Sequence, residues 1–137
     1  MEPIAVIKNG RTYALFFPKN LRAPEGVRFL TEQTMPLQVG LMERKAGYVV
    51  QPHTHPPVER TLHSTPEFLY VESGQILVKV FDESWALLEE RAIGAGDFLL
   101  LLAGGHSMEI REDARFMEVK QGPFAGPGKD KVSPPSL

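Results

Sequence analysis

Glycine and proline place the strongest constraint on the fold of this chain. The 137 residues include 12 glycines and 12 prolines, spread along the whole sequence. Both residues punctuate secondary structure, so few uninterrupted segments are long enough for a helix of ordinary length. The segments between them are rich in β-branched and aromatic residues, which is typical of strands. The sequence therefore predicts an all-β sandwich or barrel of about nine to eleven short strands.

Two turn signals define hairpins. Asn9-Gly10 separates two apolar runs and predicts a hairpin over residues 4–17. Glu72-Ser73-Gly74 separates Phe68–Val71 from Gln75–Phe81 and predicts a second hairpin. The remaining strands are expected at Gln38–Glu43, Tyr48–Gln51, Leu87–Ile93, Phe98–Leu102, His106–Ile110 and Phe116–Val119.

Evidence for helix is limited to two places. Residues 83–91 contain good helix formers, but their neighbours favour a turn at Asp82–Ser84 followed by a strand. The irregular stretch from Pro18 to Pro36 is expected to hold one helical turn near Glu32. The tail, residues 122–137, is rich in proline and glycine, and we expect it to be extended.

Size and composition narrow the function classes. We expect a single domain over residues 1–137, since 42% apolar and 23% charged residues are ordinary globular values. The absence of cysteine excludes a disulfide framework, a thiolate metal site and a cysteine nucleophile. A net charge of −2 gives no large basic face for nucleic acid. The apolar run Phe98–Ala103 is far too short to cross a membrane, and no signal peptide is evident, so a cytoplasmic location is expected.

The histidines form the most informative chemical pattern. His53 and His55 are two residues apart, so on a strand both side chains would face the same way, about 6.6 Å apart. Two imidazoles at that spacing can bind one metal ion. The alternative is that His53 and His55 are polar surface residues of a proline-rich loop.

Glu67 and His106 extend this pattern to a possible ligand set. Glu67 opens a predicted strand, and His106 begins another whose inward face would also carry Met108 and Ile110. Three imidazoles and one carboxylate suit a borderline divalent ion such as Fe, Mn, Co, Ni or Zn. Such a set leaves one or two coordination positions open for water or a substrate.

The spacing of these residues resembles a known family. The chain reads Gly47-x5-His53-x-His55-x11-Glu67-x6-Gly74, and then Gly96-Asp97-x6-Gly104-x-His106. These segments resemble the two motifs of the cupin family. The resemblance implies a double-stranded β-helix, the jelly-roll barrel of cupins, over about residues 38–119, with little helix. It also implies one divalent transition metal bound by His53, His55, Glu67 and His106.

The chain departs from the cupin pattern at two points. Eleven residues separate His55 from Glu67, where the family has three or four, so an enlarged loop is expected at the mouth of the barrel. Glu59 or His63 in this loop is therefore open as an alternative fourth ligand. In the second motif Leu102 replaces the usual proline, and His106 follows Gly104 one residue sooner, which loosens the turn.

The enlarged loop also holds the candidate catalytic residues. Arg60 would orient an anionic group of a bound ligand, because its guanidinium donates two parallel hydrogen bonds. His63 would exchange a proton, since its unperturbed pKa is near 6.5. The alternatives are that Arg60 pairs with Glu59 or Glu67 and that His63 is solvated.

Two functions follow from these residues. The first is a metal-dependent enzyme that acts on a small polar or anionic metabolite, a sugar or an organic acid, by isomerase, epimerase, lyase or dioxygenase chemistry. The second is a non-catalytic module that binds such a molecule; a pocket-facing His63 favours the enzyme. The resemblance to cupins also implies a homodimer, in which the edge of the hairpin at residues 4–17 would be covered.

Overall fold

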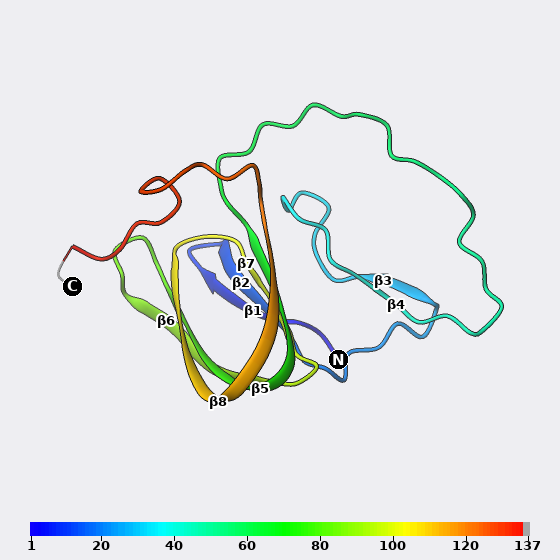
Figure 1. Cartoon of the computed structure of the whole chain (residues 1–137), viewed down its shortest axis with the longest axis horizontal. Coiled ribbons are helices and arrows are strands. Elements are labelled where there is room, and N and C mark those ends of the chain that lie inside the picture. Colours follow the sequence, from blue (N-terminus) through cyan, green and yellow to red (C-terminus); the bar gives the residue numbers. More distant parts are fainter. Residues whose placement is uncertain (136–137) are drawn as a thin grey trace.

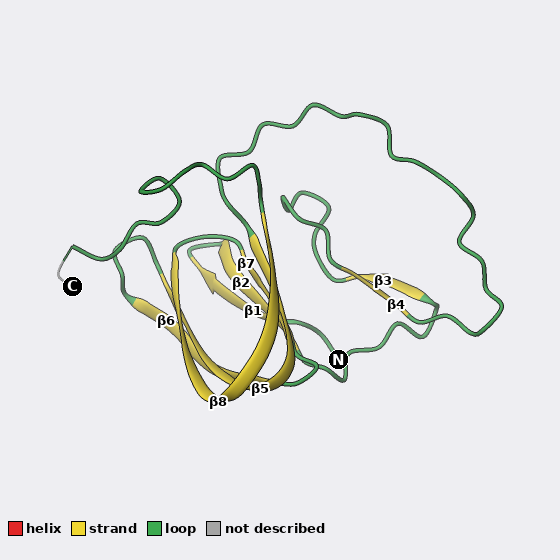
Figure 2. Ribbon diagram, in the orientation of Figure 1, coloured by secondary structure: helices red, strands yellow, loops and turns green. Residues whose placement is uncertain are grey.

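The computed structural model describes residues 1–135. Within this range the chain is all-β and has no helix (Figure 2). The described residues therefore contain no helix that could cross a membrane. This confirms the predicted all-β class, and the strands within these residues number eight rather than nine to eleven. They are β1 (Ile4–Lys8), β2 (Arg11–Phe17), β3 (Val27–Phe29), β4 (Gly40–Met42), β5 (Glu67–Phe81), β6 (Leu87–Gly94), β7 (Phe98–Leu101) and β8 (Gly105–Lys120).

Two long strands organise the main sheet. Its strands run antiparallel in the order β1-β2-β7-β5-β6, and β8 pairs with β5 along its other edge. The first residues of β5 pair with β7, whereas residues 75–81 pair with β6. Because β5 passes from β7 to β6 along one edge while β8 follows its other edge, the sheet curls into a half-barrel (Figure 1).

The hairpin predicted at Glu72-Ser73-Gly74 is wrong, because β5 continues through these residues. The register between β5 and β8 is irregular from Val71 to Ile76, so the strand bends instead of reversing. Gly74 has a φ of 85°, and a Cβ atom there would collide with the backbone of Asp113 in β8. Glycine is thus required at a corner where two strands approach closely.

A second break in the predicted strands is also absent. His106–Ile110 and Phe116–Val119 belong to one strand, β8, since residues 111–115 continue the pairing with β5. The predicted strand at Tyr48–Gln51 does not form, and these residues have no regular structure. Near Glu32 a hydrogen bond from the Met35 amide closes a turn, without a helix.

Several other expectations are confirmed. Asn9 and Gly10 both have positive φ and close the hairpin of β1 and β2. Residues 87–94 form a strand rather than a helix. Beyond β8 the chain has no strand or helix up to Pro135, and the last two residues of the predicted tail lie outside the described range.

Two apolar clusters cover the two faces of β2 and β7. The first fills the half-barrel and includes Phe16, Leu69, Ile76, Val78, Val80 and Leu99. The second joins Leu15, Phe17 and Leu100 on the outer face to the segment of residues 18–42, which carries β3 and β4. Because both faces are covered, the last five residues of β2 are all buried.

Candidate functional site

The register of β5 and β8 places polar side chains on the inner face of the half-barrel. Residues paired across antiparallel strands point to the same side of a sheet. His106 pairs with Val80, and Glu118 pairs with Leu69, and both partners are buried in the inner core. Glu67 shares the face of Leu69, because the two are separated by one residue. The inward orientation predicted for His106 is therefore observed, and Glu67 lies on the same face.

The curl of the sheet brings Glu67 and His106 together from opposite ends of β5. The Nε2 atom of His106 lies 3.2 Å from Oε2 of Glu67, with 31% and 13% of the side chains exposed. The contact lacks hydrogen-bond geometry, and Oε2 is buried without a hydrogen-bond partner. The imidazole lowers the pKa of Glu67, an effect that burial of the carboxylate opposes.

Glu118 adds a second carboxyl group beside this pair. Partial burial and the negative charge of Glu67 raise the pKa of Glu118. Lys120 follows on the same face, and its Nζ donates a hydrogen bond of 2.9 Å to Asp130 of the C-terminal tail. The inner face at this end thus combines one imidazole and two carboxyl groups with the ammonium group of Lys120.

The other two predicted ligands lie in a long exposed segment. We call Arg44–Thr65 the arm; it contains no strand, and each of its residues is exposed. The rings of His53 and His55 lie edge to face with centroids 5.3 Å apart, and Nδ1 of His53 is 2.8 Å from the carbonyl oxygen of Gln51. In Figure 1 the arm forms a wide arch that leads from β4 to the start of β5.

The structure thus brings together two of the four predicted ligands. Glu67 and His106 meet inside the half-barrel, whereas His53 and His55 are neighbours in the arm. Within residues 1–135, no three His, Asp or Glu side chains form a group that could hold a metal ion.

The remaining candidates also belong to the arm. Glu59, Arg60 and His63 are exposed. Arg60 forms no ion pair with Glu59 or Glu67 among the residues described. All three therefore lie outside the half-barrel, away from its core.

Both ends of the arm are held by neighbouring segments. Before its start, Glu43 accepts hydrogen bonds from Arg22, at 2.5 Å from Nη2, and from the amide of Ala23. These contacts lower the pKa of Glu43. After its end, Pro66 is buried, and its carbonyl oxygen accepts a hydrogen bond of 3.1 Å from the amide of Gln121.

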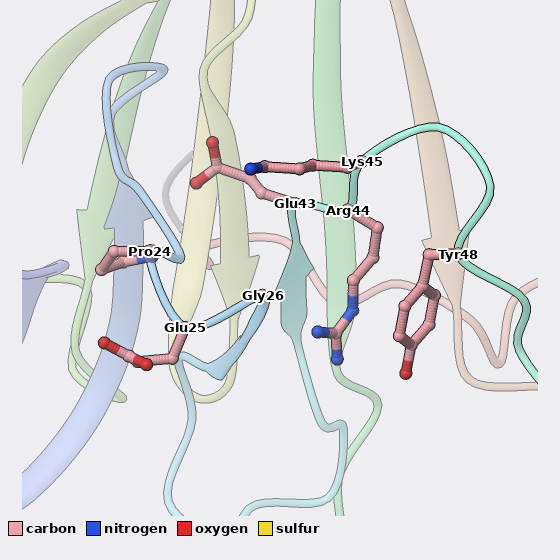
Figure 3. A pocket seen from close by; sticks show the side chains of 7 residues that line it. All are labelled: Pro24, Glu25, Gly26, Glu43, Arg44, Lys45 and Tyr48. Carbon is pink, nitrogen blue, oxygen red and sulfur yellow. The ribbon is translucent and has the colours of Figure 1, made fainter.

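A hollow of about 460 Å³ lies at the base of the arm (Figure 3). The guanidinium carbon of Arg44 is 4.3 Å from the centroid of the Tyr48 ring, which places the two side chains in cation–π contact. The other lining residues are Pro24, Glu25, Gly26, Glu43 and Lys45. The hollow shares no residue with the pair of Glu67 and His106.

Glu118 was not identified as a site residue from the sequence. Its spacing from His106 is even, so on one continuous strand both side chains would share a face. The two residues were instead assigned to separate strands, His106–Ile110 and Phe116–Val119, so this shared face was not evident.

Comparison of the chain with protein-family models, with curated proteins and with solved structures gave no match. The resemblance to cupins therefore rests on the residues and spacings of the two motifs.

Proposed function

We infer that the protein binds one divalent transition metal in a cupin-type jelly-roll barrel, where it holds a small polar or anionic molecule such as a sugar or an organic acid. The observation that carries this proposal is the contact between Glu67 and His106 on the inner face, where a carboxylate oxygen is buried without a hydrogen-bond partner. An unpartnered buried carboxylate oxygen is costly, and a coordinated cation removes that cost.

The donor set fits a borderline metal. Imidazole nitrogen and carboxylate oxygen are ligands that Fe, Mn, Co, Ni and Zn accept, and Glu118 supplies further negative charge nearby. A bound ion of this kind supplies Lewis acidity that polarises an oxygen atom of the ligand. His106 is partly exposed, so a small molecule can reach the pair from solvent.

Residues of both the half-barrel and the arm would bind the metal and the small molecule. Glu67 and His106 are fixed by the pairing of β5 with β8, and they would provide the rigid half of the ligand set. His53 and His55 would complete it from the arm. Arg60 would bind an anionic group of the ligand, and His63 would exchange a proton with it.

Elemental analysis of protein purified without chelator or affinity metal tests this proposal. We expect close to one equivalent of metal per chain, either as purified or after addition of Fe, Mn, Co, Ni or Zn. Glu67→Gln and His106→Ala should each weaken binding by more than the roughly 10–100-fold that follows loss of an outer-shell partner. Glu90→Gln removes an exposed carboxylate of β6, away from the arm and the pair, and should leave the metal content unchanged. Absence of metal under all five additions would overturn the proposal.

A further inference from the structure

The outer edge of β8 is unpaired along its length. This strand has 16 residues and pairs with β5 alone among the strands described. A long open edge presents a row of free backbone N–H and C=O groups, which proteins normally cover or interrupt. Another extended segment could therefore add to the sheet at this edge.

Exposed side chains on the inner face show that the half-barrel is open beside this edge. Ile110 pairs with Ile76, and Phe116 pairs with Val71, so both should be as buried as their partners. Ile76 and Val71 are fully buried, whereas Ile110 is 50% exposed and Phe116 is 37% exposed. The inner core therefore lacks a covering segment along β8.

The arm has the properties of the missing segment. Tyr48, Val49 and Val50 are residues that favour strands, yet they are 56%, 63% and 64% exposed. Only Gln51 and Pro52 separate them from His53, so a strand formed here would bring both imidazoles with it.

The charges of the arm and the edge are complementary. Between Glu43 and Glu67 the arm carries three basic residues and one acidic residue, which are Arg44, Lys45, Arg60 and Glu59. The first part of β8, residues 105–113, carries three acidic residues and one basic residue, which are Glu109, Glu112, Asp113 and Arg111. Attraction between them would favour the pairing.

We propose that the arm of one chain pairs along the open edge of β8 in a second copy of this chain, so that His53 and His55 of each chain complete the site formed by Glu67 and His106 of the other. The inference rests on the proposed function and names the partner that this site requires. A reciprocal exchange of identical segments closes into a symmetric dimer.

The path of the arm favours a second copy over its own half-barrel. In Figure 1 the arm arches away from β8 instead of following it. From Val49 to Thr65 no backbone hydrogen bond joins the arm to the half-barrel. A segment that is anchored at both ends and extended outward is in the arrangement expected of an exchanged arm.

Cross-linking tests the pairing without reference to metal. The natural chain has no cysteine, so Val50→Cys with Ile110→Cys supplies the only two thiols. With a short flexible bis-maleimide at high protein concentration, we expect a dimer band on a denaturing gel. The matched control pairs Val50→Cys with Leu87→Cys, an equally exposed position on β6, and should give little dimer. Cross-links confined to single chains, or equal yields for both pairs, would overturn the proposal.

A mixing experiment tests whether the site is shared. His53→Ala/His55→Ala and Glu67→Gln/His106→Ala chains should each bind no metal alone. When they are refolded together, half of the dimers are mixed and each mixed dimer has one intact site, so about a quarter of the wild-type metal content should return.

The outcomes of the two experiments separate the exchange from the proposed function. No recovery in the mixture, with metal bound by the wild-type protein, would overturn the exchange and leave metal binding intact. No metal in the wild-type protein would overturn the metal site, and the cross-linking result would still decide the pairing of the arm.

Discussion

The half-barrel and the arm contain similar kinds of residues but differ in what holds their backbones. In the half-barrel, Val71, Ile76 and Val78 lie on β5 between paired neighbours and are fully buried. In the arm, Val49 and Val50 have the same β-branched side chains and remain mostly exposed, with no neighbouring strand. The difference shows that strand propensity alone does not form a strand, because its backbone groups and apolar face need a partner.

The predicted ligands differ in the same way, because two lie on paired strands and two lie in the arm. Glu67 and His106 occupy fixed positions because the core holds β5 and β8. His53 and His55 are placed only by whatever the arm contacts. Metal binding would therefore depend on docking of the arm as well as on the four ligands.

Substitution of an apolar residue in each region should give the largest contrast. Leu99 is fully buried in the inner core, so Leu99→Ala should lower the free energy of unfolding by about 2–5 kcal/mol. Val50→Ala in the arm should change the stability of the monomeric half-barrel by less than about 0.5 kcal/mol. Urea unfolding of dilute, metal-free protein measures both values, and equal losses would show that the arm is part of the core.

Two glycines sharpen the comparison at the level of the backbone. Gly74 and Gly47 both have positive φ, but only at Gly74 would a new Cβ atom meet backbone atoms of β8. Gly74→Ala should therefore lower the free energy of unfolding by about 3 kcal/mol, because the new Cβ atom adds both left-handed backbone strain and a collision. Gly47→Ala should lower the free energy of unfolding by about 1 kcal/mol or less, since a Cβ atom there meets no neighbouring atom. Similar unfolding midpoints for the two variants would contradict this account.

Two carboxylates with lowered pKa values give a smaller, pH-dependent contrast. Asp82 accepts hydrogen bonds from Lys8, at 2.5 Å from Nζ, and from Ser84 and Ala86, and it ties β1 to the turn after β5. These contacts lower the pKa of Asp82 far below its ordinary 3.8. The pKa of Glu43, at the base of the arm, is lowered chiefly by Arg22.

The sign of the effect follows from these directions. A carboxylate with a depressed pKa stabilises the folded state above its unfolded pKa, and the contribution is lost as the pH falls through the folded pKa. Asp82→Asn should therefore destabilise the protein at pH 7 and progressively less below about pH 3.8. Glu43→Gln should show the same trend with a smaller amplitude, because its side chain is more exposed. Unfolding curves from pH 3 to pH 7 measure both trends, and a destabilisation independent of pH would contradict them.

Turn chemistry and side-chain period explain which parts of the fold could be predicted from the sequence. Asn9-Gly10 favours a tight hairpin through its local sequence alone. The two-residue period of strand side chains accounts for the inner-face positions of Glu67 and His106. Glu72-Ser73-Gly74 contains turn-forming residues, but the residues before and after this segment both pair with β8, so β5 remains continuous. Local composition cannot reveal that long-range pairing.

The arm has a strand-like composition without a strand. Tyr48–Gln51 has the composition of a strand, and its lack of a partner within the described chain is a property of the tertiary structure. For the same reason, the spacing of His53 and His55 identifies candidate ligands without placing them near Glu67.

Hydrogen exchange measured with and without metal tests most directly whether the arm and the half-barrel together form the site. Without metal at low protein concentration, amides of residues 47–55 and those on the outer edge of β8 should exchange rapidly, while β5 is protected. With metal, both the arm and the β8 edge should become protected together. Full metal occupancy with continued rapid exchange at both segments would contradict the account.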